Sequence, residues 1–330
     1  MIGTRSGNIF EIEISEDDRL IKPKQGQEIK LKKWIECIDH ETPRNLSIDK
    51  TSTRIFTITT MGMFSIWDLR TFELIYTREF HKRARMIYSF KLSNKVMLVF
   101  ENEIIVLNSD PEQNTFEEMP RYNLKLNTIS DCKVNHSEKI LGVATISAAA
   151  PEVSLYDTDD GFSLLKTLYG FKASIKYIDF SSDNYYLQCE DNLGEIMLFE
   201  IETQRVVHTD AIDFELEWLG EGLKSSSTLK GVHYFYDHNN KITEIAKVIG
   251  LPVVAISDDL GTIRLFSYPN KDGEPYYQCY ADHLYSVSNC LFSPNRKLLL
   301  STSEYDRCVF KWKVHYRKDI IEKYEQNEEF

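Results

Sequence analysis

A six-residue pattern of apolar and polar positions recurs along the chain. In each copy, a turn residue and one variable position precede a short strand that ends on a large apolar or aromatic side chain. The seven copies are residues 7–12, 62–67, 102–107, 151–156, 194–199, 261–266 and 307–312. Several of the distances between copies are close to the period of about 40 to 45 residues that is typical of a four-stranded propeller blade.

Other strands flank these copies. Apolar strands such as 54–60 and 297–302 precede them, and more polar strands such as 72–76 follow. β-Branched and aromatic residues bounded by turn residues favour strands over helices. Only residues 317–330 show a helical period. Because a sheet of four short strands cannot bury both faces alone, neighbouring sheets must stack into a ring.

The pattern therefore predicts an all-β fold, a β-propeller of about seven blades. The first blade is incomplete, because residues 1–14 supply its third strand and 28–35 its fourth. An insertion is expected at 213–239 and an acidic C-terminal tail at 315–330, after a propeller that spans 1–314. The predicted blades are 1–38, 39–81, 82–124, 125–171, 172–212, 240–281 and 282–314.

Several of these segments resemble the WD-repeat family. Trp67 and Asp68 form the signature dipeptide. The last blade contains His283, Ser301 or Ser303, Asp306 and Trp312 at the places of the family's hydrogen-bonded set. The resemblance implies that His283 bridges a hydroxyl group and Asp306 behind a tight turn and so ties three strands together.

The second half of the chain resembles a narrower group, the echinoderm microtubule-associated protein-like family. The resemblance covers residues 214–314 and includes an acidic-aromatic segment around Trp218 within an overlong connection. Residues 3–7 are similar to the strand pair that opens the family's second propeller. The family carries tandem propellers and an amino-terminal coil, so the resemblance implies that this chain is the carboxy-terminal part of a longer protein or has its first blade completed by another chain.

Composition limits the class of partner. The chain has 330 residues, is 42% hydrophobic and carries 39 Lys and Arg against 51 Asp and Glu, a net charge of −12. This balance argues against nucleic acid as the main partner, because phosphate binding requires a basic surface. The longest apolar run, 248–256, is too short to cross a bilayer. The six cysteines form no CxxC pair, which is typical of reduced thiols in a cytosolic protein.

Charge is unevenly placed along the chain. Residues 1–100 carry 17 Lys and Arg against 13 Asp and Glu, whereas the remainder is strongly acidic. Two basic clusters are candidate partner-binding residues, although solvated loops would explain them as well. They comprise Lys22, Lys24, Lys30, Lys32, Lys33, Lys82, Arg83 and Arg85. Such clusters would steer association with an acidic protein surface.

No motif indicates catalysis or a bound cofactor or metal. The chain lacks a phosphate-loop lysine, a GxSxG elbow and an HExxH pair. Cys279, His283 and Cys290 have no fourth zinc ligand at a suitable spacing. His233 and His238 fall on opposite faces of a regular strand, so we expect surface or turn histidines. We therefore expect no catalytic, cofactor-binding or metal residues.

The family resemblance implies a non-enzymatic scaffold associated with microtubules in the cytoplasm and cytoskeleton, including the cilium and its axoneme. Tubulin or other microtubule-associated proteins would be its partners, and the insertion would protrude as an additional contact. A generic WD-repeat adaptor that binds a peptide across its channel is the alternative. An enzyme of the propeller-hydrolase type would require carboxylates or histidines gathered around the channel, and the sequence shows no such cluster.

Overall fold

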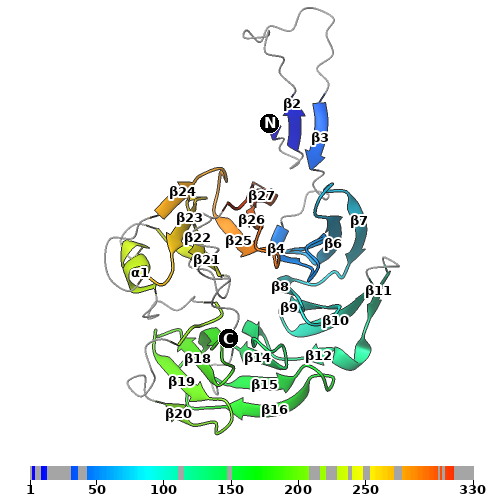
Figure 1. Ribbon diagram of the computed structural model, residues 1–330. Helices are drawn as coiled ribbons and strands as arrows, with labels where there is room; N and C mark the ends of the chain where they lie inside the picture. Colours follow the sequence, from blue (N-terminus) through cyan, green and yellow to red (C-terminus); the bar gives the residue numbers. More distant parts are fainter. Residues whose placement is uncertain are drawn as a thin grey trace, which may run out of the picture.

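The computed structural model describes thirteen stretches of the chain. They are residues 2–3, 9–12, 31–35, 43–110, 115–146, 151–207, 216–220, 229–236, 240–247, 253–270, 277–303, 305–306 and 309–315. Six antiparallel sheets in these stretches form a ring, shown in Figure 1. We number the sheets as blades 1 to 6 in chain order.

Each blade is built as a meander whose strands pair with their neighbours in the sequence, and only the last strand of blade 2 pairs outside this order. Blade 1 contains β4 (Pro43–Ile48), β5 (Arg54–Thr59), β6 (Met63–Asp68) and β7 (Leu74–Glu79). Blade 2 contains β8 (Ala84–Ser89), β9 (Lys95–Phe100), β10 (Glu103–Asp110), β11 (Thr115–Glu118) and β12 (Leu124–Lys125), with the 3-10 helix η1 (Pro120–Tyr122). Blade 3 contains β13 (Ile129–Val134), β14 (Ile140–Thr145), β15 (Val153–Asp157) and β16 (Ser163–Leu168).

The second half of the ring follows the same plan. Blade 4 contains β17 (Ile175–Phe180), β18 (Tyr186–Asp191), β19 (Ile196–Glu200) and β20 (Val206–Val207). The helix α1 (Lys230–Tyr236) precedes blade 5, which contains β21 (Ile242–Lys247), β22 (Val253–Asp258), β23 (Ile263–Ser267) and β24 (Tyr277–Tyr280). Blade 6 contains β25 (Val287–Phe292), β26 (Leu298–Ser303) and β27 (Val309–Lys313).

The apolar core lies between the blades. Shared clusters of buried side chains join blades 1 and 2, 2 and 3, 3 and 4, 5 and 6, and 6 and 1. Phe56 and Phe100, for example, belong to the cluster between blades 1 and 2. This arrangement explains why the strands before the hexapeptides are mainly apolar and almost fully buried, since both faces of the second strand of each blade pack against a neighbouring blade.

The prediction of about seven blades is wrong, because the ring has six. The described part of the first hexapeptide does lie on a strand, but among the described strands β1 (Ile2–Gly3), β2 (Ile9–Ile12) and β3 (Leu31–Ile35) pair only with one another. Blade 6 packs directly on blade 1 instead. Leu300 shares a cluster with Leu46 and Ile55. A hexapeptide identifies a strand, whereas ring closure depends on contacts between the two ends of the chain.

The closure between blades 6 and 1 also uses two polar contacts. The backbone N–H of Asn295 donates to Ser52 Oγ at 3.2 Å, and Lys311 Nζ donates to the carbonyl oxygen of Leu69 at 3.2 Å. These contacts join residues more than 240 positions apart in the chain. Blade 6 has only three described strands, and no described strand from the start of the chain is added to it as a fourth. Side-chain packing and hydrogen bonds therefore hold the ring closed between blades 6 and 1.

The described parts of the insertion pack into the ring. Trp218 bridges to Ser181 beside β17, and Lys247 Nζ donates to the Trp218 carbonyl oxygen at 3.2 Å. The segment thus connects blade 4 to blade 5, where the described residues form no shared apolar cluster. We expected the insertion to protrude, and for these residues that expectation is wrong.

The helix α1 was also not predicted. Leu229, Val232 and Tyr236 repeat at helical spacing and are buried in one cluster with Phe266 of blade 5. A helix of seven residues is unstable alone, so this packing is what stabilises it. No helix among the described residues is long and apolar enough to cross a membrane.

Candidate functional site: the central channel

The six innermost strands share one irregularity. In β4, β8, β13, β17, β21 and β25 the pairing register shifts around the second residue, which is the mark of a β-bulge. The residues at this position are Arg44, Arg85, Ser130, Lys176, Thr243 and Ser288. All six line the cavity at the centre of the ring. We call these six residues the bulge ring.

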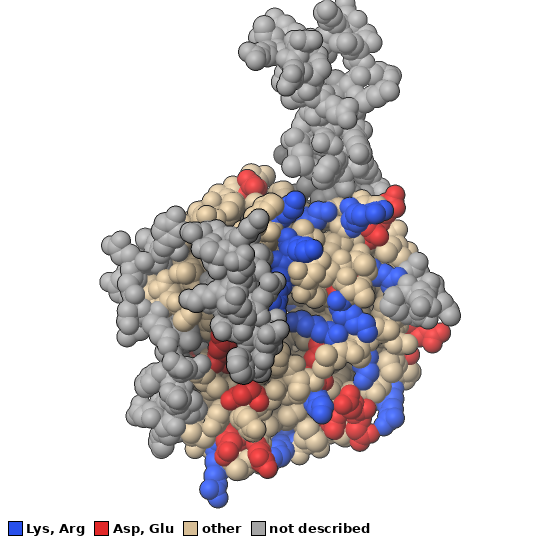
Figure 2. Space-filling model, viewed as in Figure 1, with Lys and Arg blue, Asp and Glu red and all other residues tan. Residues whose placement is uncertain are grey.

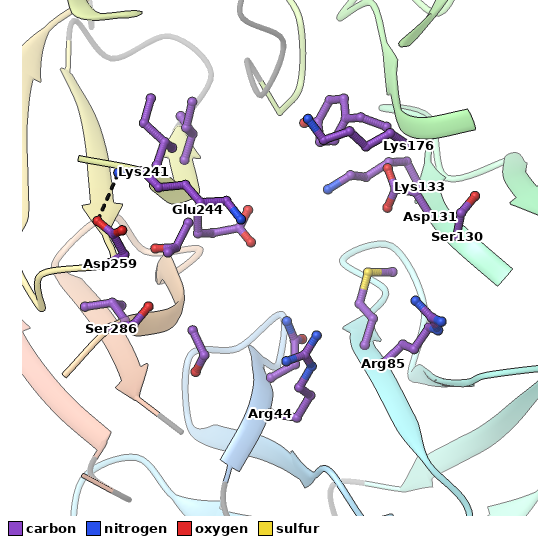
Figure 3. Close-up of a pocket in the computed structure, with 18 of the residues that line it drawn as sticks. Arg44, Arg85, Ser130, Asp131, Lys133, Lys176, Lys241, Glu244, Asp259 and Ser286 are labelled. Atoms are coloured by element: carbon purple, nitrogen blue, oxygen red, sulfur yellow. Dashed lines mark hydrogen bonds between the residues drawn. The ribbon is translucent and has the colours of Figure 1, made fainter. Parts of the chain in front are cut away.

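The cavity that they line is a channel of about 1050 Å³. Figure 3 shows Arg44 pointing into it from blade 1 and Lys133 and Lys176 from blades 3 and 4, while Arg85 lies along the wall at blade 2. Glu244 and Asp259 lie on the opposite wall, in blade 5. Figure 2 shows Lys and Arg side chains gathered at the middle of this face, on the side of blades 1 and 2. The channel is therefore electrostatically polarised.

Two neighbouring members of the bulge ring have buried polar atoms without a hydrogen-bond partner. These atoms are Arg85 Nε and Ser130 Oγ. Lys176, the next residue of the ring, lies 3.6 Å from Glu190 Oε1 and is thus partly neutralised. Because buried polar groups are nearly always paired in native proteins, the Arg85–Ser130 side of the channel is the part of the wall best suited to a ligand.

The residue after the bulge links one blade to the next. Asn45 Oδ1 accepts the backbone N–H of Ile87 at 3.1 Å, and Asp131 Oδ2 accepts that of Ile178 at 2.9 Å. Both bonds run from the third residue of one inner strand to the fourth residue of the next. These bonds hold the innermost strands of blades 1 and 2, and of blades 3 and 4, against each other beside the bulges.

Burial raises the pKa of Asp131, although Lys133 and the N–H groups of Ile178 and Cys132 act in the opposite direction. Burial also raises the pKa of Glu244. Burial alone would lower the pKa of Lys133, but the neighbouring Tyr177, Asp131 and Glu244 raise it well above its usual value. Lys133 Nζ lies 5.3 Å from the centre of the Tyr177 ring. The positive charge of Lys133 is therefore retained inside the channel.

Carboxylates do face the channel, which the sequence analysis did not detect. Asp131 accepts two backbone N–H groups, and Asp259 accepts the backbone N–H of Lys241 at 2.9 Å. The two carboxylates therefore stabilise the backbone of the channel wall. The described residues contain no group of three or more His, Cys, Asp or Glu side chains that could hold a metal ion. The arrangement suits binding of a charged ligand.

The described members of the predicted basic clusters lie in different surroundings. Lys82 pairs with Glu103 at 2.7 Å and Arg83 with Glu101 at 3.2 Å, whereas Arg85 lines the channel. Lys32 and Lys33 lie on β3. Lys22, Lys24 and Lys30 lie outside the described residues. Of the eight candidates, the structure thus places only Arg85 among the residues that line the channel.

The residues expected to tie the strands together do meet. In blade 6, Ser301 Oγ lies 2.8 Å from His283 Nε2 and accepts the indole N–H of Trp312 at 2.9 Å. His283 Nδ1 lies 2.8 Å from Asp306 Oδ2. In blade 1, Trp67 Nε1 donates to Thr57 Oγ1 at 3.0 Å, and Asp68 Oδ1 accepts the N–H groups of Arg70 and Thr71 in the following turn. These contacts leave His283 fully engaged and unavailable to a metal.

Sequence reasoning missed Arg44, Ser130, Lys133, Lys176 and Glu244. Aligning the start of the first strand of each blade would have found Arg44, Ser130 and Lys176, because each is the second residue of its strand. The bulge that turns this position toward the channel is invisible in the hydrophobic pattern, since the register shift changes which face a residue occupies.

Comparison with solved structures supports the fold. A chain of the structure titled "Crystal Structure of Mitotic Checkpoint Complex" is 11% identical with a TM-score of 0.60, and the match covers 90% of this chain and 98% of the other. A chain of Kuenenia stuttgartiensis hydrazine synthase is 12% identical with a TM-score of 0.56, over 90% of this chain and all of the other. At these identities the likeness concerns the fold alone.

Curated relatives are similar over about half of this chain. Human "Echinoderm microtubule-associated protein-like 4" is 23% identical over 146 residues, which are 44% of this chain and 15% of that protein. The "77 kDa echinoderm microtubule-associated protein" of Lytechinus variegatus is 22% identical over 161 residues, 49% of this chain and 24% of that protein. The chain therefore matches only a minor part of the length of each relative.

One family model extends over most of the ring. It describes the second β-propeller of echinoderm microtubule-associated proteins and matches residues 45–314, from β4 to just beyond β27. The match includes all six blades and the connection that carries Trp218 and α1. This chain belongs to the family of the second β-propeller of echinoderm microtubule-associated proteins.

Proposed function

We propose that this chain is a non-enzymatic propeller scaffold that associates with microtubules through tubulin or through other microtubule-associated proteins. The observation that carries the proposal is the family match over residues 45–314, together with relatives whose names state microtubule association. The proposed locations are the cytoplasmic cytoskeleton and the axoneme of cilia.

The charge distribution supports a surface-recognition mechanism. The first 100 residues are net basic within an acidic chain. In blade 2, Lys82 and Arg83 are already paired with glutamates of that blade. We therefore assign the main electrostatic contact to Lys22, Lys24, Lys30, Lys32 and Lys33. Contacts of this kind steer association and weaken with salt.

Co-sedimentation with polymerised tubulin at several salt concentrations tests the proposal. We expect the chain to pellet at low salt and less at high salt. Failure to pellet at the lowest salt concentration would contradict the proposal. The double variant Lys32→Glu, Lys33→Glu should pellet less than the parent chain. The matched control Lys139→Glu, Lys313→Glu changes two exposed lysines of the acidic part of the chain and should pellet like the parent chain.

Imaging of the tagged protein in ciliated cells tests the location. Signal along cytoplasmic microtubules and the axoneme is the expected result. A diffuse signal, with proximity labelling dominated by proteins that are not cytoskeletal, would favour the generic adaptor instead.

A further inference from the structure

Arg85 differs from the other cations of its surroundings. Arg78 pairs with Glu118 at 3.1 Å, Lys82 with Glu103 and Arg83 with Glu101. No carboxylate of a described residue lies within ion-pairing distance of Arg85, and its Nε atom is buried without a hydrogen-bond acceptor. An unpaired buried donor on a charged group costs free energy, which a bound anion would recover.

The bulge positions on either side of Arg85 carry cations and a hydroxyl group, and none of these positions carries a carboxylate. Arg44, Arg85, Ser130 and Lys176 occupy the same bulge position in four consecutive blades and all line the channel. Ser130 Oγ is the second buried atom without a partner and can donate its proton to an oxyanion. A guanidinium next to a hydroxyl group, with further cations on either side, matches the planar carboxylate group.

An exposed apolar patch adjoins the channel at blades 5 and 6. Leu260, Leu284, Tyr285 and Tyr305 are 61%, 81%, 54% and 69% exposed. The rings of Tyr285 and Tyr305 lie 5.9 Å apart, and Tyr305 itself lies near the channel. The turn of Leu260 packs on the same segment, since a Cβ atom at Gly261 would lie 2.7 Å from the Tyr285 carbonyl oxygen. Exposed apolar patches of this kind mark interaction sites.

We propose that the channel mouth binds an acidic peptide segment of a partner protein, with a carboxylate on the arc of Arg44, Arg85, Ser130 and Lys176 and an apolar side chain on the patch of Leu260, Leu284, Tyr285 and Tyr305. A channel of about 1050 Å³ accommodates several peptide residues. A compact polyphosphate fits less well, because it offers nothing to the apolar patch. This inference does not depend on microtubule association.

Fluorescence anisotropy with a labelled decapeptide of Glu and Leu in a Gly-Ser background tests this site. We expect salt-sensitive binding that weakens about tenfold in Arg85→Gln, the loss of one charge-assisted hydrogen bond. The matched control is Arg83→Gln, which lies two residues away and outside the channel lining. It should bind like the parent chain. A peptide with Gln in place of Glu, or with Ser in place of Leu, should bind more weakly.

Two further variants keep the test decisive. Thermal melting detects whether Arg85→Gln folds. If it does not fold, Ser130→Asp still tests the arc, because it places a negative charge there and should weaken peptide binding. Leu284→Ser should weaken binding through the apolar patch alone. The proposal is overturned if the parent chain does not bind the decapeptide, if Arg83→Gln loses as much affinity as Arg85→Gln, or if pyrophosphate binds with the same affinity and displaces the peptide.

Discussion

The imidazole of His283 contacts the carboxylate of Asp306, with 2.8 Å between Nδ1 and Oδ2. The other ring nitrogen lies 2.8 Å from Ser301 Oγ, which also accepts the indole N–H of Trp312. One buried histidine therefore connects the segment before β25 with β26, β27 and the turn between them. His283 lies in blade 6, which closes the ring against blade 1. Loss of its side chain should therefore weaken the contact between the first and last blades.

Replacing His283 by Ala should destabilise the protein. The change removes one buried hydrogen-bond partner from each of Asp306 and Ser301, and we expect a total loss of about 1–3 kcal/mol. Urea unfolding followed by circular dichroism measures it. Leu284→Ala is the control, because this neighbouring side chain is 81% exposed and its removal should change the free energy of unfolding by less than about 0.5 kcal/mol. Equal losses in the two variants would refute a tying role for His283.

Two glycines at equivalent turns of blades 4 and 5 should respond differently to replacement by Ala. Gly261 and Gly194 have φ angles of +81° and +80°, so both substitutions carry the backbone strain of a left-handed residue. A Cβ atom at Gly261 would lie 2.5 Å from the His283 carbonyl oxygen, whereas one at Gly194 would meet nothing within 4 Å. Gly194→Ala should cost about 1 kcal/mol. Gly261→Ala should cost about 1–3 kcal/mol more, as in other overpacked sites. Identical melting temperatures for the two variants would contradict the close approach.

The buried pair of Asp258 and Arg264 should be the main polar support of blade 5. Asp258 also accepts the N–H groups of Leu260 and Thr262, and Arg264 Nη1 donates to Tyr236 of α1 at 3.0 Å. Asp258→Asn should cost about 3–5 kcal/mol, because it leaves a buried guanidinium without its counter-charge. Its neighbour Asp259 is exposed, and Asp259→Asn should cost less than about 1 kcal/mol. Hydrogen exchange in α1 should increase only in the first variant.

Stability should depend on pH through Asp131. Burial raises the pKa of this carboxyl above its ordinary value of 3.8, while Lys133 acts against the shift. The folded protein therefore takes up this proton at a higher pH than the unfolded chain does. As the pH falls from neutral through the folded-state pKa, the free energy of unfolding of the parent chain should rise relative to that of Asp131→Asn, which cannot titrate.

Denaturant unfolding of both proteins between neutral and acidic pH measures this difference. Asn at position 131 can still accept the N–H of Ile178, as Asn45 does for Ile87, so the variant should fold. Glu244→Gln should show the same trend, because burial also raises the pKa of Glu244. A difference that stays constant with pH, or falls as the pH is lowered, would show that folding does not raise the pKa of Asp131.

The strands and their chemistry were determined by the sequence alone. The hexapeptide ending at Trp67 and the one ending at Trp312 both lie on strands, and the residues of the His283 set meet in one hydrogen-bonded group. The strands depend on the alternation of side chains and on turns between near neighbours in the chain, so a local pattern is enough to predict them. The His283 set was predicted from the resemblance to the WD-repeat family.

The number of blades in the ring and the charged channel were decided only by the tertiary structure. Closure depends on contacts such as that of Lys311 with Leu69, which lie far apart in the sequence. Arg85 and Ser130 become neighbours because bulges in separate blades turn both toward one axis. The helix α1 exists because blade 5 buries its apolar face. Such long-range packing leaves no periodic signal in the chain, since its energy comes from surfaces that meet only after folding.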